Sequence, residues 1–307
     1  MTLDRVPTWP LTAALILSIA IGVAVFFHGD DIRWLAAAEL LLLTALALAL
    51  LRDTSGLRLP LTPLSVSLSA FWLWLAVSLA WSRVSVTSVL NFWWVGSFAL
   101  VFWTYTLSSE RSRIAAFASY LVLAGALVLS AWAVVQLFAF GQPPRASFIN
   151  IHSFAALLML VALPTAGYWL TALASGRRRA ALVSGAALLL LFFTIALTRG
   201  RGTSLALWLA VGLLIALHVG RARRRHLLSL AGLLAAAYGV ANALLFGELG
   251  DRFATLTDPE HAASPRLLIW QGAWQMLHDA PWWGIGLGTY YLAWPPYRHP
   301  ADETLGF

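Results

Sequence analysis

The sequence predicts an all-α, polytopic membrane protein, and three observations support this fold class. Of the 307 residues, 60% are hydrophobic and 11% are charged, whereas soluble globular domains carry about 25% charged residues. The mean hydropathy is +0.79. Several apolar runs approach the length of about 20 residues that a helix needs to cross a bilayer. We therefore expect about nine transmembrane helices.

Short polar or charged stretches separate the predicted spans. The first span follows one Arg and has no small-residue cleavage site, so we interpret it as a retained helix and not as a signal peptide. We expect a transmembrane bundle over residues 1–246 and a loop region rich in Pro and Gly, with an amphipathic helix, over residues 247–307. The predicted spans are 11–27, 34–51, 64–81, 86–107, 114–140, 151–174, 180–197, 203–219 and 227–246.

The placement of arginine predicts how the bundle is oriented. All 20 basic residues are Arg, and short cytoplasmic loops are enriched in basic residues. With a cytoplasmic N-terminus, the two strongest arginine runs, at 177–179 and 221–225, both face the cytoplasm. The turn at 198–202 and the region after residue 246 then face outward.

Two cations, Arg199 and Arg201, lie in this outward turn, which reads "TRGRG". Glycines at 200 and 202 let the backbone turn tightly and approach a ligand. Two like charges in so short a turn repel each other, so an anion between them is favourable. The alternative is that both guanidinium groups extend to lipid headgroups.

A further outward arginine, Arg266, lies at the start of a predicted amphipathic helix. Ser264 suits the N-cap and Pro265 the first helical position, and the helix ends near Pro281. The helix N-terminus and Arg266 together form a candidate phosphate site; alternatively, Arg266 pairs with an acidic residue just upstream. One face carries the apolar residues and is expected to lie on the membrane: Leu267, Trp270, Ala273, Trp274 and Leu277.

Other polar candidates lie near the predicted membrane boundary or within a span. Arg145, Asn150 and His152 surround the outward start of the sixth span, where helix capping by Ser147 or Asn150 is the simpler role. Glu39 lies inside the second predicted span, and acidic residues within a membrane are functional candidates. An ion pair between Glu39 and an outward arginine explains this residue equally well.

Several kinds of site have no support in the sequence. The chain has no Cys, which excludes disulfides and thiolate chemistry. Its seven His residues show no metal-ligand spacing, so we expect no metal and no other cofactor. The stretch "GIGLG" at 284–288 lacks the setting of a dinucleotide-binding loop, and we interpret it as a turn. Topology explains the arginine runs, so no nucleic-acid partner is expected.

Three stretches resemble segments of the O-antigen ligase / Wzy C-terminal superfamily. "LTRGRGTSLALWLAVGLL" is similar to "LTxSRGxxLAL", with Arg201 on the family arginine. "SPRLLIWQGAWQMLHDAPWWGIGLGTY" resembles "SxRxxxWxxAxxMxxDxPxxGxGxGxF", with Arg266 on its arginine. "ASFINIHSFAALLMLVALP" resembles "FxNxNxFAxxLxxxLP"; Asn150 matches, and His152 replaces the second Asn. The resemblance covers about residues 147–307.

The resemblance implies a metal-independent glycosyltransferase of the bacterial inner membrane that acts on the periplasmic face. The donor is an undecaprenyl-diphosphate-linked glycan. Ligases transfer the glycan to the lipid A core, whereas relatives polymerise glycan units or glycosylate protein hydroxyls. Arg201 and Arg266 would be the catalytic residues that bind the diphosphate. Secondary candidates for binding diphosphate or glycan are Arg199, Arg145, Asn150, His152 and Glu39.

One segment of the family pattern is missing from this chain. The family's proposed catalytic His lies in an "HNxxL"-like segment followed by further spans, and no such segment occurs before Phe307. His299 lacks the following Asn and is not assigned this role. We therefore expect a C-terminally incomplete chain that is inactive alone.

The non-enzymatic alternative is a transporter of a lipid-linked glycan or a small anion.

Overall fold

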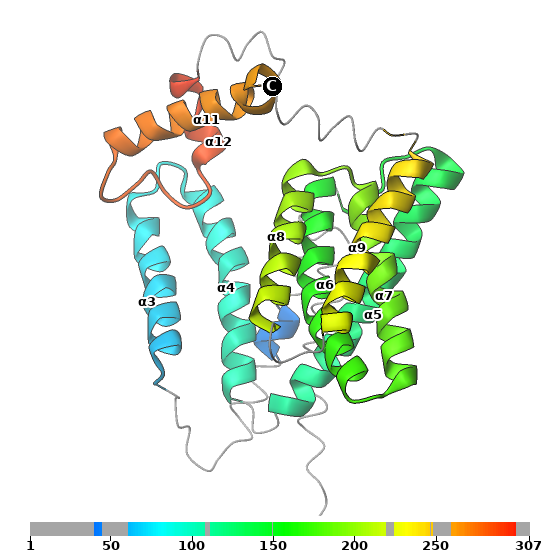
Figure 1. Cartoon of the computed structure of the whole chain (residues 1–307). Helices are drawn as coiled ribbons and strands as arrows, with labels where there is room; N and C mark the ends of the chain where they lie inside the picture. The colour runs from blue at the N-terminus through cyan, green and yellow to red at the C-terminus, as the bar shows by residue number, and fades with distance from the viewer. Residues whose placement is uncertain are drawn as a thin grey trace, which may run out of the picture. The chain divides into compact units, whose positions relative to one another are not determined.

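The computed structural model describes residues 40–44, 61–107, 111–148, 150–218, 224–245, 247 and 259–298. Throughout these residues the regular structure is helical, and no strand occurs among them. The helices belong to two compact units, which are described separately (Figure 1). Unit 1 contains α3, α4, the beginning of α5, α11 and α12, and unit 2 contains the rest of α5 with α6 to α9.

Unit 1 begins with a pair of helices, α3 (Pro63–Ser78) and α4 (Ser85–Leu107), joined by the short helix η1 (Leu79–Trp81). A capping box fixes the start of α3, because the Thr62 hydroxyl accepts from the Ser65 N–H at 3.1 Å and the Ser65 hydroxyl accepts from the Thr62 N–H at 2.9 Å. Pro63 then occupies the first helical position, where its missing N–H removes no helical hydrogen bond.

The second part of unit 1 comprises α11 (Pro259–Asp279), α12 (Tyr290–Ala293) and η3 (Pro295–Tyr297). Helix α11 packs closely on the segment that follows it: a Cβ atom on Gly272 would overlap the Trp294 ring and lie 2.7 Å from the Tyr297 carbonyl oxygen. The Tyr297 hydroxyl also donates to Asp279 Oδ2 at 2.6 Å. Helix α11 is therefore held to the segment that follows α12.

The predicted start of α11 is wrong, although its end is close to the prediction. The helix begins at Pro259 and not at Pro265, so Ser264 is not its N-cap. Pro259 presents the same sequence signal as Pro265, since proline is favoured in a first helical turn. Because Arg266 is well inside α11, the predicted anion site made by Arg266 and the helix N-terminus is not formed.

The predicted apolar face of α11 is largely exposed. Trp270 is 66% exposed and Trp274 is 61% exposed, whereas Met276 on another face is buried. This face is therefore available for the membrane surface, and its contact with lipid remains a prediction.

Unit 2 is a bundle built around α7. It contains α5 (Arg111–Phe140), α6 (Ile151–Ala174), α7 (Arg178–Leu197), α8 (Arg201–His218) and α9 (Arg224–Leu244). More than half of α7 is buried, 56% of its apolar window, against 11% for α3 in unit 1. Leu188, Leu191 and Phe192 on α7 are completely buried, so this helix forms much of the apolar core.

Six of the described helices are long and apolar enough to cross a membrane: α3, α4, α5, α6, α7 and α9. Helix α8 is apolar but shorter. Seven of the predicted spans therefore coincide with described helices. The predicted span 11–27 lies outside the described residues, and only 40–44 of the span 34–51 is described. The protein is a multi-pass membrane protein; the total of nine spans stays a prediction.

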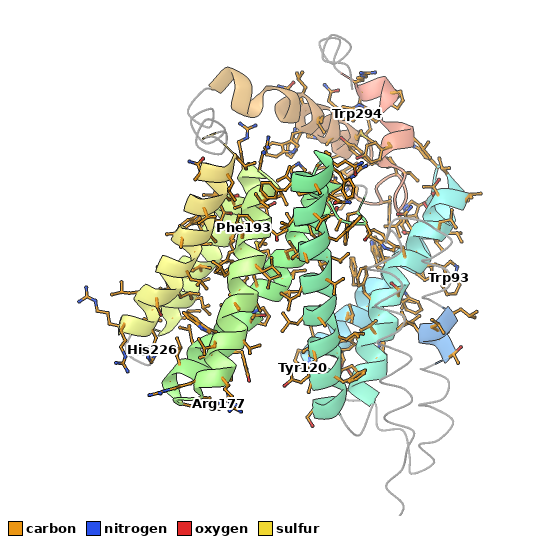
Figure 2. The ribbon with its side chains drawn as sticks, turned by 90° about the vertical axis from the view of Figure 1, so that its right-hand side faces the viewer. Trp93, Tyr120, Arg177, Phe193, His226 and Trp294 are labelled. Atoms are coloured by element: carbon orange, nitrogen blue, oxygen red, sulfur yellow. The ribbon has the colours of Figure 1, made fainter. Side chains whose placement is uncertain are left out.

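Most of the predicted site residues in unit 2 lie at one end of the bundle. Arg177 and His226 lie at the same end of the unit (Figure 2), where α7 and α9 begin. The beginning of α6, the end of α7 and the beginning of α8 lie together at the opposite end, because the turn between α6 and α7 makes these helices antiparallel. Most of the predicted site residues are at this second end.

Candidate anion-binding site

Arg199 terminates α7 in a left-handed backbone conformation. It follows the C-cap Thr198 with φ of 55°, and its N–H donates to the Ala196 carbonyl at 3.0 Å. Glycine is the usual residue at such a position, because a side chain in this conformation costs roughly 1–2 kcal/mol. Strained positions of this kind are concentrated at functional sites, which makes Arg199 a functional candidate.

Helix α8 begins directly after this residue. Gly200 immediately precedes the helix, because its carbonyl accepts the first-turn hydrogen bond from the Ser204 N–H at 2.9 Å, and Arg201 is the first helical residue. The N–H groups of a first turn point out of the helix and carry partial positive charge. Arg199 and Arg201 thus adjoin a helix N-terminus, and all three features favour an anion.

The surrounding sequence contains no negative side chain to balance these cations. Between Arg111 and Gly247 there is no Asp or Glu. A carboxylate near Arg199 or Arg201 has to come from another part of the chain. Arg201 is also partly exposed, so a ligand can reach this residue.

The start of α6 lies next to the same turn. Asn150 is the N-cap of α6, and its side-chain oxygen accepts from the His152 N–H at 2.8 Å, which confirms the predicted capping role. A Cβ atom built on Gly200 would be 3.4 Å from Nδ1 of His152. The structure therefore brings the His152 ring to the Arg199–Arg201 turn, as neither segment alone could indicate.

Arg145 lies in the loop before α6, which Gln136 fixes from α5. The Gln136 amide donates to the Ala146 carbonyl at 2.9 Å and accepts from the Ala146 N–H at 2.8 Å. Ala146 has φ of 52°, so these two buried hydrogen bonds maintain a strained backbone. Arg145 itself is exposed. The role of Gln136 is not evident from the sequence, because a lone glutamine in an apolar helix shows nothing of its distant partner.

Residues 186–305 match a family model described as O-antigen ligase. This chain carries an O-antigen ligase-like segment. No match is found among curated proteins or among solved structures. The segment covers the end of α7, the helices α8 and α9, and the region that contains α11 and α12. Together with the apolar helices, the family indicates a membrane glycosyltransferase of the ligase or polymerase type.

The ligase-like segment contains only some of the predicted site residues. Arg199, Arg201 and Arg266 lie within the matched residues, whereas Arg145, Asn150, His152 and Glu39 precede them. Arg201 belongs to unit 2 and Arg266 to unit 1. The side chain of Arg266 and the whole of Glu39 lie outside the described part of the chain. The joint action of Arg201 and Arg266 therefore stays a prediction.

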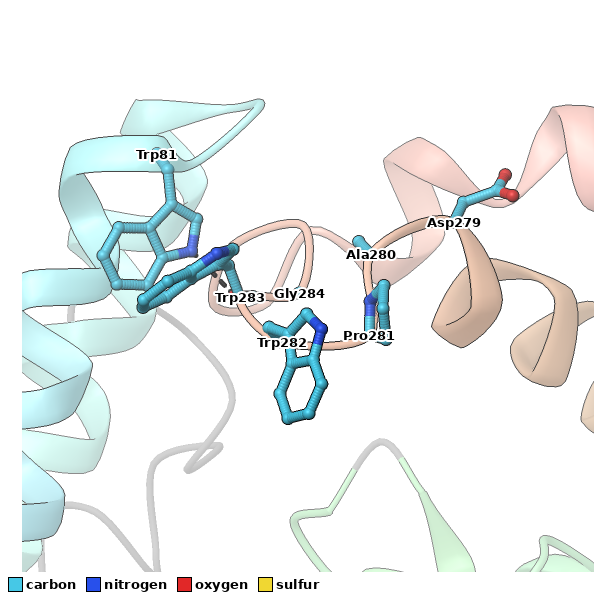
Figure 3. A pocket seen from close by; sticks show the side chains of 7 residues that line it. All are labelled: Trp81, Asp279, Ala280, Pro281, Trp282, Trp283 and Gly284. Carbon is cyan, nitrogen blue, oxygen red and sulfur yellow. Dashed lines mark hydrogen bonds between the residues drawn. The ribbon is translucent and has the colours of Figure 1, made fainter.

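The ligase-like segment also lines a pocket of about 570 Å³ in unit 1. Trp81 and Trp283 lie against each other at one side of it, and Trp282 extends from the opposite side of the loop (Figure 3). Asp279 is the one ionisable residue of this lining, and its carboxylate is directed away from the indoles. The pocket has an aromatic surface without the positive charge that a phosphate site needs.

The Asp279 carboxylate is engaged by Tyr297 instead. This hydrogen bond, followed by burial, raises the pKa of Tyr297 above its usual value, an effect that the nearby Arg83 opposes. Within the described residues, no group of three or more His, Asp or Glu side chains is placed to hold a metal ion. The best-supported site is thus the arginine turn at the end of unit 2.

Proposed function

We propose that the protein transfers a glycan from an undecaprenyl-diphosphate donor to the lipid A core on the periplasmic face of the bacterial inner membrane. The observation that carries this proposal is the strained Arg199–Arg201 turn at the start of α8, inside the O-antigen ligase-like segment. A polyprenyl diphosphate keeps its tail in the bilayer and its charged group at the surface. A cationic helix terminus at the end of an apolar bundle suits such a molecule.

The chemical need for cations arises when the glycosyl bond breaks. The departing diphosphate gains negative charge, and positive groups fixed in advance stabilise that charge in the transition state. A guanidinium forms two parallel hydrogen bonds with a phosphate, which gives geometry as well as charge. In this proposal Arg201 binds the diphosphate, and Arg199 with the first-turn N–H groups of α8 assists it.

The proposal includes Arg266 as a second diphosphate ligand, on the basis of its place in the family segment. The acceptor hydroxyl must lose a proton to a base, and no residue of this chain is assigned to that role. Arg145, Asn150, His152 and Glu39 are proposed as secondary contacts for the diphosphate or the glycan. The remaining partners are the lipids of the surrounding membrane.

The test is glycan transfer in proteoliposomes that contain the purified full-length protein, an undecaprenyl-diphosphate-linked glycan and lipid A core. We expect Arg201→Ala and Arg266→Ala each to reduce the transfer rate by about 10²–10³-fold, the usual effect of losing one charge-stabilising group. Arg201→Lys should recover only part of the rate, because an ammonium does not form the paired contact.

Arg177→Ala is the matched control. Arg177 lies at the opposite end of unit 2 (Figure 2) and packs over the Tyr168 ring at 5.4 Å, so its loss should leave transfer unchanged. Equal transfer by the Arg201→Ala variant and the wild type would refute the proposal. Elongation of the donor glycan without lipid A labelling would indicate a polymerase, and glycan uptake without transfer would indicate a transporter.

A further inference from the structure

The loop that follows α11 lies directly on the turn between α3 and α4. Three alternate carbonyl groups of this loop, those of residues 283, 285 and 287, accept hydrogen bonds from that turn. The Trp81 indole N–H donates to Trp283 at 2.7 Å. The Arg83 backbone N–H donates to Ile285 at 3.1 Å, and the Ser88 hydroxyl donates to Leu287 at 2.7 Å.

Glycines at 284, 286 and 288 alternate with the residues that bear these carbonyls, and the last two of them touch the turn or α4. Gly286 has φ of 111°, and a Cβ atom on it would lie 2.8 Å from Cβ of Ser82. Gly288 has φ of 71°, and a Cβ atom there would overlap the Asn91 side chain. Both the backbone conformation and the available space therefore require glycine at these positions.

Aromatic packing extends the same contact. The Trp283 ring stacks on Trp74 with centroids 5.9 Å apart and meets the edge of Trp81 at 5.5 Å. Such ring pairs stabilise a contact beyond the area that they bury. Residues of α3, η1 and α4 thus hold one loop through hydrogen bonds, close backbone approach and ring stacking together.

The α3–α4 turn lies outside the O-antigen ligase-like segment, and the loop lies inside it. The loop begins where α11 ends, at Asp279, and α12 with η3 packs back on α11 through Gly272 and Tyr297. A continuous series of contacts therefore joins the turn to the loop and the loop to α11, the helix that carries Arg266.

We infer that Trp81 and Ser88 are positioning residues for the proposed transfer reaction, because they hold the loop at 280–289 and with it α11. The positioning role rests on the proposed function, whereas the attachment of the loop does not. Because small displacements of a catalytic group reduce the rate strongly, detachment should reduce kcat. The donor KM should rise by a smaller factor than kcat falls, since Arg266 is displaced but the proposed ligands in unit 2 are untouched.

The first test compares two serines on the same helix. Ser88→Ala removes the donor to Leu287, and Ser97→Ala is its control, because the Ser97 hydroxyl bonds only to Trp94 of its own helix among the hydrogen bonds described. In nanodiscs, Ser88→Ala should speed backbone hydrogen exchange by about tenfold in residues 82–88 and 283–289 together. Ser97→Ala should speed neither.

The second test adds a methyl group at residue 288 and removes the Asn91 atoms that this group would overlap. Gly288→Ala should detach the loop, because the new methyl group overlaps the Asn91 amide. Asn91→Ala removes the overlapping atoms, so the double variant Gly288→Ala/Asn91→Ala should recover the part of the exchange protection and of kcat that the overlap costs. The part lost to the positive φ of residue 288 should remain. A variant that merely unfolded the chain would not be rescued by a second truncation.

The possible results distinguish the attachment of the loop to the α3–α4 turn from the effect of this attachment on transfer. Unchanged exchange in both segments of Ser88→Ala and Gly288→Ala would overturn the attachment. Faster exchange with normal kcat would overturn the positioning role. A full-length wild-type protein without transfer activity would refute the proposed function, while the exchange experiment would still decide whether the loop is held by the α3–α4 turn.

Discussion

Nδ1 of His152 lies 3.4 Å from the point where a side chain on Gly200 would begin. The same point is 3.3 Å from Oγ1 of Thr203. The start of α6 and the start of α8 therefore meet at Gly200. Arg199 and Arg201 flank this glycine, so the contact fixes the backbone between the two arginines.

Gly200→Ala should destabilise the protein by about 1 kcal/mol, because the added methyl group crowds two neighbours. Gly202→Ala is the matched control, since no atom lies within 4 Å of its added carbon, and alanine in a helix gains about 0.5–1 kcal/mol over glycine. Thermal unfolding in detergent micelles should give changes of opposite sign. Equal stabilities of the two variants would contradict the contact with His152.

Arg199→Gly should stabilise the protein by about 1 kcal/mol, because glycine adopts the left-handed conformation without strain. Arg199→Ala removes the charge and keeps the strain, so it should give no such gain. Both variants should weaken the binding of undecaprenyl diphosphate in nanodiscs. Binding as tight as that of the wild type in both would exclude Arg199 from the anion site, whatever their stability.

Gln136→Ala should cost about 2 kcal/mol or more, because it leaves both the N–H and the carbonyl of Ala146 without their buried partner. Gln142→Ala is the control, since its side chain is exposed in the same region. Chemical or thermal unfolding measures the difference. A loss in Gln142→Ala as large as that in Gln136→Ala would show that the side-chain hydrogen bonds do not hold the loop.

The pKa of Tyr297 should lie above the usual tyrosine value of 10.0, because the hydrogen bond to Asp279 favours the neutral phenol. The hydrogen bond between Tyr297 and Asp279 therefore contributes fully to the free energy of unfolding below pH 10. This contribution is lost as the pH rises through the higher pKa that Tyr297 has in the folded state. The absorbance titration at 295 nm of the wild type minus Tyr297→Phe isolates this group. Asp279→Asn should bring its ionisation to lower pH; an unchanged titration would argue against the bond.

The helices could largely be predicted from the sequence, because apolar length is a local signal. The predicted span 151–174 has the same limits as α6, and the predicted span 180–197 ends with α7 at Leu197. Asn150 was also predictable as a cap, since its preference depends on the adjacent turn alone. The start of α11 was not, because Pro259 and Pro265 present the same local preference.

The site was predictable in its residues but not in its contacts. Local sequence placed both Arg199 and Arg201 in a turn; Arg199 lies there, whereas Arg201 is already the first residue of α8. "GIGLG" is a turn as expected. Nothing local indicated that His152 reaches Gly200, or that the carbonyl of Leu287 meets Ser88. These contacts join residues far apart along the chain, and they depend on how helices pack rather than on any propensity.

The alternating carbonyls of residues 283, 285 and 287 have a practical consequence for chimeric proteins. A graft of residues 186–305 onto another membrane scaffold would leave those three acceptors without the donors that Trp81, Arg83 and Ser88 supply. A functional chimera should therefore contain the α3–α4 hairpin together with the O-antigen ligase-like segment, both taken from the same protein.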